Sequence, residues 1–161
     1  MKRRRRPRAA RKLPLGFSRQ TQSCRRIEAE WEFACRAGTT TPFHSGPGFP
    51  NGTTNDGLAG TIAWYNANSG SVTHAVGGKA ANALGMHDML GNVWEWQSDW
   101  YGAYSSGAQT NPTGPGSGTS RVLRGGSWNN DTRVVRSSYR TNNSPGSSNN
   151  ELGFRVARAP S

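Results

Sequence analysis

GMHDMLGNVWEW, residues 85–96, is the stretch of sequence that decides the fold of this chain. It places Trp94 and Trp96 two positions apart, with Glu95 between them. Rings this close together are favourable when they are buried, and a carboxylate buried beside them needs a partner. The stretch therefore predicts a packed junction of the core in which Glu95 is held by another group.

Three further motifs surround this stretch in the order helix, strand, strand. EAEWEFACRAGTTTPF spans residues 28–43, RVLRGGSW spans 121–128, and LGFRVAR spans 152–158. Together the four motifs resemble the formylglycine-generating enzyme, or sulfatase-modifying factor, family. The resemblance implies an α+β fold, an irregular and loop-rich variant of the C-type lectin fold. Residues 28–158 would form the C-terminal part of such a domain, because the N-terminal half that the family carries has no counterpart here.

Charge divides the chain at about residue 26. The net charge is +11, and residues 1–26 contain eleven Lys or Arg and no Asp or Glu, whereas the remainder is balanced. We expect residues 1–26 to be a basic disordered tail that adds nothing to the core. Binding of nucleic acid through this tail and a truncated or frame-shifted gene start are the alternatives.

No targeting or membrane signal is visible in the sequence. An apolar stretch of signal-peptide length does not follow the basic run, and no stretch approaches the length of a transmembrane helix. The sequence therefore predicts no membrane span and leaves the cellular compartment unknown.

The composition favours loops over regular elements. The chain has 21 glycines and only 32% hydrophobic residues, which is typical of a fold with little helix or sheet. We expect short strands at 62–65 and 73–77. The alternating patterns at 121–126 and 153–158 predict two further strands, which we expect to pair with each other.

The helical motif has one apolar face and no capping side chain. Ile27, Trp31, Ala34 and Cys35 share that face at helical spacing. No Ser, Thr, Asp or Asn stands before Ile27 to cap the helix, and Gly38 is expected to end it. Cys35 is predicted to be a small core residue.

Cysteine usage argues against the chemistry of the family. Its enzymes use a pair of cysteines just beyond the GGS motif to bind copper and activate oxygen. Cu(I) is soft and prefers sulfur, but the stand-ins near Asn130 and Val134 carry none, and no cysteine follows Cys35. We therefore expect no copper and no catalytic residue. A bridge between Cys35 and Cys24 is possible.

The resemblance also implies a structural calcium ion at the GNVWEW turn. The matching positions are Asp88, Gly91, Val93 and Glu95. Calcium prefers hard oxygen ligands, which two carboxylates and two backbone carbonyls would supply. The alternative is that Glu95 pairs with an arginine such as Arg124 or Arg155.

The segment 129–150 is the predicted binding surface. It is rich in Asn, Ser and Thr, which offer adaptable hydrogen bonding around Tyr139, as in paratopes. We expect it to bind a protein or another surface ligand. The candidate ligand-binding residues are Trp128, Asn129, Asn130, Asp131, Tyr139, Thr141, Asn142, Asn143, Ser147 and Asn149. Three arginines in this segment, at 133, 136 and 140, would face an acidic ligand or pair with Asp131 and Glu151 as structural salt bridges.

The same segment resembles the variable region of proteins diversified by retroelements. Such diversification mutates adenines and cannot convert Asn codons into Glu, Lys, Gln, Met or Trp codons. None of these five residues occurs at positions 129–150, although a plain surface loop explains the composition equally well. Two functions thus remain. The first is a non-catalytic binding module. The alternative is an oxidoreductase relative of the sulfatase-maturing enzymes, or a truncated remnant of one.

Overall fold

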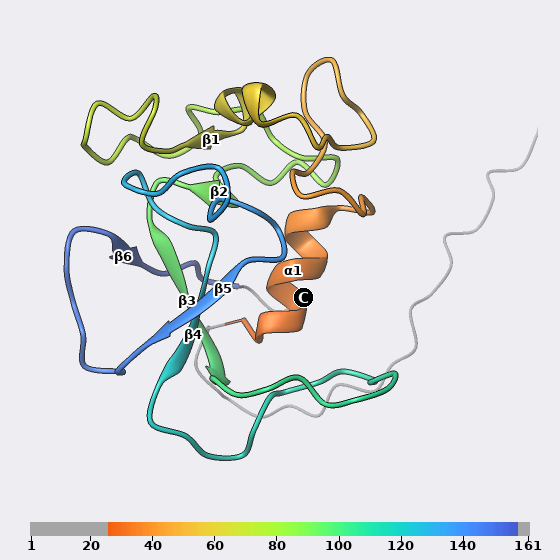
Figure 1. Ribbon diagram of the computed structural model, residues 1–161, viewed down its shortest axis with the longest axis vertical. Coiled ribbons are helices and arrows are strands. Elements are labelled where there is room, and N and C mark those ends of the chain that lie inside the picture. The colour runs from red at the N-terminus through yellow and green to blue at the C-terminus, as the bar shows by residue number, and fades with distance from the viewer. Residues whose placement is uncertain (1–25, 158–161) are drawn as a thin grey trace, which may run out of the picture.

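The computed structural model describes residues 26–157. This part of the chain contains one α-helix, one 3-10 helix and six short strands, joined by long loops (Figure 1). The helices are α1 (Glu28–Arg36) and η1 (Asp56–Thr61). The strands are β1 (Ala63–Trp64), β2 (Leu90–Gly91), β3 (Trp94–Trp100), β4 (Arg121–Arg124), β5 (Arg140–Asn143) and β6 (Leu152–Gly153).

The strands form two sheets. β1 and β2 pair in parallel, and the larger sheet has the order β5-β4-β3-β6. β4 lies antiparallel to both of its neighbours, whereas β6 runs parallel to β3. Figure 1 shows α1 beside this larger sheet and the loops around η1 and β1 stacked above it. The loop-rich α+β architecture predicted from the sequence is therefore present.

The α1 helix uses its predicted face but is shorter than the motif. Trp31, Ala34 and Cys35 are buried. No side chain on Ile27 caps the helix; instead Asp99 in β3 accepts the Glu28 backbone N–H at 2.7 Å. The helix ends at Arg36, and the left-handed residue that terminates it is Ala37, with φ 48°. The expected end of the helix at Gly38 is thus met, because Ala37 and Gly38 both have positive φ and stop the helical hydrogen-bond ladder.

The core lies between α1, β2 and the loops that precede β1. Its largest fully buried apolar side chains are those of Trp31, Phe43, Ile62, Met89, Leu90 and Val135. Gly91 is required where β2 meets β1, because it has φ +75° and a Cβ there would overlap the carbonyl of Trp64. The GNVWEW stretch thus enters the sheet through a junction that only glycine fits.

Two strand predictions need correction. Residues 73–77 form turns and irregular backbone, although the strand expected at 62–65 exists as β1. The strand expected at 153–158 is reduced to β6, and it pairs with β3, not with β4. The free edge of β4 is taken by β5, which lies in a segment that the sequence marked as loop.

The prediction for the basic tail lies almost wholly outside the described residues. Its last residue, Arg26, belongs to the folded part, since its carbonyl accepts the N–H of Ser98 at 3.0 Å. Among residues 26–157, no helix is long and apolar enough to cross a membrane.

Candidate functional site

The GGSW turn leads the chain from β4 into the predicted binding segment. Gly125 and Gly126 have φ of +95° and +78°, and a Cβ on Gly126 would lie 2.9 Å from Val135. This close approach turns the backbone so that Ser127 becomes fully buried. The turn therefore fixes where the exposed segment begins.

A hydrogen-bonded cluster ties the start of the segment to its end. The Ser127 hydroxyl lies 2.9 Å from the Asn130 side-chain oxygen and 2.5 Å from Glu151 Oε2. Asn129 reaches the other oxygen of Glu151 at 3.4 Å, and Trp128 Nε1 donates to the carbonyl of Asn150 at 3.2 Å. The two ends of the segment 129–150 are thus closed against each other.

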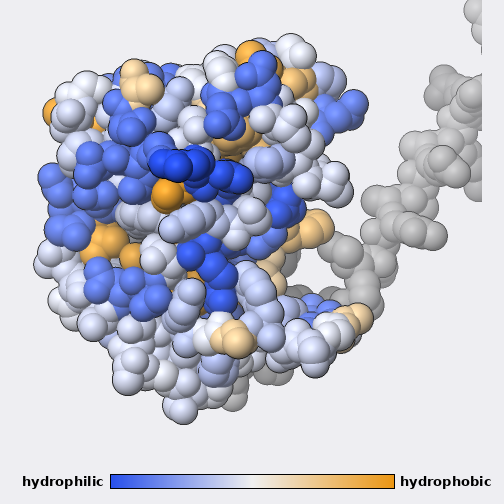
Figure 2. Space-filling view, in the orientation of Figure 1, coloured by the Kyte–Doolittle hydropathy of each residue, from blue (hydrophilic) through white to orange (hydrophobic). Residues whose placement is uncertain are grey.

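The middle of the segment is displayed on the edge strand β5. Tyr139 is 39% exposed and its ring tilts against Trp94, with centroids 6.0 Å apart. Asn142 is exposed, whereas Asn143 accepts the Ser147 hydroxyl at 2.9 Å and shapes the following turn. Figure 2 shows the face over β5 as predominantly hydrophilic, with isolated apolar spots.

The structure gathers most of the predicted ligand-binding residues into two groups. Trp128, Asn129 and Asn149 adjoin Glu151. A second group comprises Tyr139 directly before β5, Thr141, Asn142 and Asn143 on β5, and Ser147 after it. Asp131 instead pairs with Arg133, and its neighbour Thr132 donates to Asp56 in η1.

The three arginines of the segment have internal partners. Arg133 binds Asp131 at 2.6 Å and its hydrogen bonds lower the pKa of that carboxyl. Arg136 donates to the carbonyl of Thr132, and Arg140 pairs with Glu28 on α1. Arg133 and Arg140 thus form structural ion pairs, whereas the bond of Arg136 is to a backbone carbonyl, and no ion pair with Glu151 is found among the described residues.

Among residues 26–157, no cysteine side chain is exposed at this surface. Cys35 is fully buried, 3.5 Å from the Ser137 hydroxyl, and burial raises its pKa to about 12. The positions after Ser127 hold the Asn130 amide, bonded within the turn, and the partly buried Val134. Amide and alkyl side chains cannot hold Cu(I) or act as thiolate nucleophiles, so the described residues do not fit copper here.

The four predicted calcium ligands line one hollow of about 640 Å³. Asp88, Gly91, Val93 and Glu95 all border it. Asp88 accepts the Gly77 N–H at 2.6 Å through one oxygen, while its other oxygen is buried without a hydrogen-bond partner. That orphaned oxygen fits a bound cation.

Glu95 already has donors in this hollow. It accepts Trp31 Nε1 at 2.7 Å and Arg155 at 2.8 Å. The Arg155 guanidinium also donates to the carbonyls of His87 and Asp88 at 3.0 Å each. A calcium ion would therefore have to share Glu95 with Arg155, or displace Arg155 from it.

A third cluster of polar side chains was not predicted from the sequence. Glu28, Asp99, Tyr104 and Arg140 meet where α1 approaches β3 and β5. Only the alternation of WEWQSDW, which puts Glu95, Gln97 and Asp99 on one side of β3, pointed to it. The partners come from residues more than seventy positions apart.

Comparison with known proteins places these features in context. Residues 26–160 match the family described as the Sulfatase-modifying factor enzyme 1-like domain. The formylglycine-generating enzyme of Streptomyces coelicolor is 36% identical over 143 residues, covering 81% of this chain and 45% of that protein. Serine/threonine-protein kinase pkn1 of Chlamydia caviae is 38% identical over 135 residues, covering 81% of this chain and 20% of that protein.

Among solved structures, Treponema denticola variable protein 1 superimposes with a TM-score of 0.73 and 39% identity. The match covers 81% of this chain and 45% of that one. The chain thus spans less than half the length of these relatives. The matches confirm the predicted loop-rich, C-type lectin-like fold.

Proposed function

We propose that this chain, which belongs to the family of sulfatase-modifying factor enzyme 1-like domains, is a non-catalytic module. It binds a protein through residues 129–150. The observation that carries the proposal is that the amide of Asn130 and the alkyl side chain of Val134 stand after the GGS turn in place of the two thiols. There Asn130 is held within the turn by Ser127. A site without thiolates lacks the soft ligands by which the enzymes of the family bind Cu(I).

The geometry of the segment supports binding. Its ends are closed by the Ser127–Glu151 cluster, so the intervening residues are presented on a fixed base. Tyr139 packs on Trp94 but keeps 39% of its surface exposed, and Asn142 stands exposed beside it on β5. A rigid aromatic anchor next to adaptable amides loses little conformational entropy on binding.

We further propose that the segment is diversified by a retroelement. The absence of Glu, Lys, Gln, Met and Trp from positions 129–150 supports this, as does the similarity to a protein named variable protein 1. A reverse-transcriptase gene and a near-copy of the segment coding for 121–158 beside this gene are expected. An adjacent sulfatase or kinase gene would favour the alternative of an enzyme relative.

A structural calcium ion at Asp88, Gly91, Val93 and Glu95 is part of the same proposal. The orphaned oxygen of Asp88 supports it, and a bound ion would supply only stability to the turn. The ion takes no part in ligand binding, because its hollow is lined by other residues than the segment 129–150.

A double variant tests the binding proposal. Proteins captured from a displayed proteome library by the full chain are titrated against the variant carrying Tyr139→Ala and Asn142→Ala. The expected result is at least a tenfold loss of affinity, since Tyr139 is the anchor. A matched control carries Phe154→Ala and Asn51→Ala, which change an exposed aromatic and an exposed amide elsewhere. Equal affinity of both variants for the captured protein would show that the interface does not include β5.

A further inference from the structure

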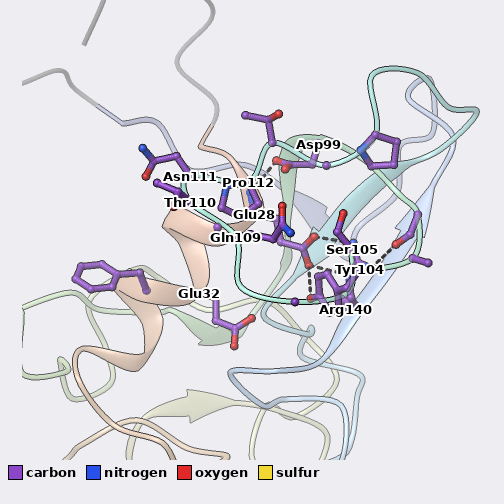
Figure 3. Close-up of a pocket in the computed structure, with 18 of the residues that line it drawn as sticks. Glu28, Glu32, Asp99, Tyr104, Ser105, Gln109, Thr110, Asn111, Pro112 and Arg140 are labelled. Atoms are coloured by element: carbon purple, nitrogen blue, oxygen red, sulfur yellow. Dashed lines mark hydrogen bonds and ion pairs between the residues drawn. The ribbon is translucent and has the colours of Figure 1, made fainter. Parts of the chain in front are cut away.

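A second hollow lies on the α1 side of the larger sheet, between the first turns of α1 and the loop 102–115 (Figure 3). Its volume of about 830 Å³ falls within the range of small-ligand sites. Figure 3 shows Glu28 and Arg140 at its floor and the loop residues Gln109, Thr110 and Asn111 around it. Only Ser138 and Arg140 are shared with the segment 129–150.

All three nitrogens of the Arg140 guanidinium at the floor donate hydrogen bonds within the protein. It donates to Glu28 at 2.8 and 2.6 Å and to the carbonyl of Gly102 at 2.7 Å. Its carbon lies 4.5 Å from the ring centre of Tyr101 and 4.3 Å from that of Tyr104. Each guanidinium nitrogen of Arg140 therefore already has a partner, and an anionic ligand would have to compete with Glu28 for this cation.

The carboxylates of the hollow are engaged in the same way. Glu28 also accepts the Tyr104 hydroxyl at 3.2 Å, and Asp99 accepts the Glu28 N–H at 2.7 Å. Glu32 forms ion pairs with Arg36 and with Arg124. A cationic ligand would have to compete with these internal partners, so neither sign of charge is favoured.

The groups that stay accessible are aromatic and neutral polar. Phe33 is 73% exposed and Tyr104 is 67% exposed, although one face of Tyr104 covers Arg140. The loop adds the side-chain amides of Gln109 and Asn111 and the hydroxyl of Thr110. Amides and hydroxyls both donate and accept hydrogen bonds, and aromatic faces pack against apolar ring faces.

We propose that this hollow binds a neutral oligosaccharide. A pyranose ring has apolar C–H faces that pack on Phe33 and Tyr104, and a rim of hydroxyls that needs partners which both donate and accept. Gln109, Thr110 and Asn111 provide such partners. An acidic sugar would find Arg140 already paired with Glu28, so its charge gains no free partner and it is expected to bind no better than a neutral sugar.

The test uses the full chain on an array of neutral tri- and tetrasaccharides of glucose, galactose and N-acetylglucosamine, with sialyllactose as the charged comparator. The best neutral sugar is then titrated by calorimetry. Replacing Phe33→Ala or Tyr104→Ala is expected to lower the association constant about tenfold, since each removes roughly 60 Å² of apolar contact. Tyr104→Phe retains the ring and is expected to bind within about twofold of the unchanged chain.

A matched control is Phe154→Ala, which removes an equally exposed ring outside the hollow and is expected to bind normally. Circular dichroism of every variant confirms folding. Failure of all neutral sugars to bind would overturn the proposal, as would preference for sialyllactose. Unaltered binding by both Phe33→Ala and Tyr104→Ala would also overturn it. The sugar titrations do not depend on whether residues 129–150 bind a protein, so failure of one proposal can be distinguished from failure of the other.

Discussion

Replacing Arg124→Ala is expected to destabilise the chain more than any surface arginine change. Arg124 is fully buried where β4 meets α1, and it forms ion pairs with Glu28 and Glu32. It also donates to the carbonyls of Ser137 and Tyr139 at 2.9 and 2.5 Å. Both carboxylates keep a second arginine in the variant, so the main loss is the two carbonyl bonds.

The magnitude follows from those orphaned groups. The buried Ser137 carbonyl left without a donor costs about 1–3 kcal/mol, and the partly buried Tyr139 carbonyl costs less because water can reach it. Together with the weakened ion pairs, the free energy of unfolding is expected to fall by about 3–5 kcal/mol. This is a large share of the roughly 5–15 kcal/mol that a domain has.

Urea unfolding followed by tryptophan fluorescence measures the difference. Arg36→Ala is the matched control, because Arg36 forms a half-exposed pair with Glu32 and should cost only about 0.5 kcal/mol. Arg124→Met fills most of the volume without donors, and is expected to remain almost as unstable as Arg124→Ala. If Arg124→Ala loses no more than Arg36→Ala, the buried charge network does not hold α1 to the sheet.

Three further predictions concern titratable groups and the metal. In a Cys24→Ser variant, Cys35 should not react with a thiol reagent at pH 8 until urea unfolds the chain, because burial raises its pKa to about 12; rapid native reaction would contradict this. Burial lowers the pKa of His44, so the folded state takes up fewer protons than the unfolded state below about pH 6.5. Stability should therefore fall as the pH drops from 7 to 5, and His44→Leu should flatten this dependence; an unchanged slope would refute it. Calcium should raise the melting temperature relative to excess chelator, Glu95→Gln should abolish that difference, and Arg155→Met should enlarge it by removing the competing cation. Identical melting of the unchanged chain in calcium and in chelator would show that the site is absent.

Local sequence patterns predicted the parts of the fold that depend on residues close together in the chain. Helical spacing predicted the buried face of Trp31 and Cys35, and alternation predicted β4. The need of Glu95 for a partner was also visible, and Arg155 was one of the partners considered. These features follow from periodicity and from the cost of burying a charge.

Long-range pairing explains what the sequence could not predict. Asp99 caps α1 from 71 positions away, and no local pattern predicts that contact. The strand β5 consists of Arg140, Thr141 and two asparagines, a composition typical of a loop, and becomes a strand because β4 offers a free edge. The hollow between α1 and the loop 102–115, which we propose binds an oligosaccharide, also depends on such pairing, since its floor joins α1 to β5.

The chain is proposed to bind a protein and not to oxidise a cysteine of a substrate peptide. Incubation with a sulfatase-type peptide tests this most directly. Purified protein is mixed with copper, oxygen, reductant and a Cys-x-Pro-x-Arg peptide, and the peptide is followed by mass spectrometry. A formylglycine-generating enzyme serves as the positive control. The peptide is expected to stay unconverted, because Asn130 and Val134 stand where the thiolates would be needed. Catalytic conversion of the peptide cysteine to the aldehyde would contradict the account.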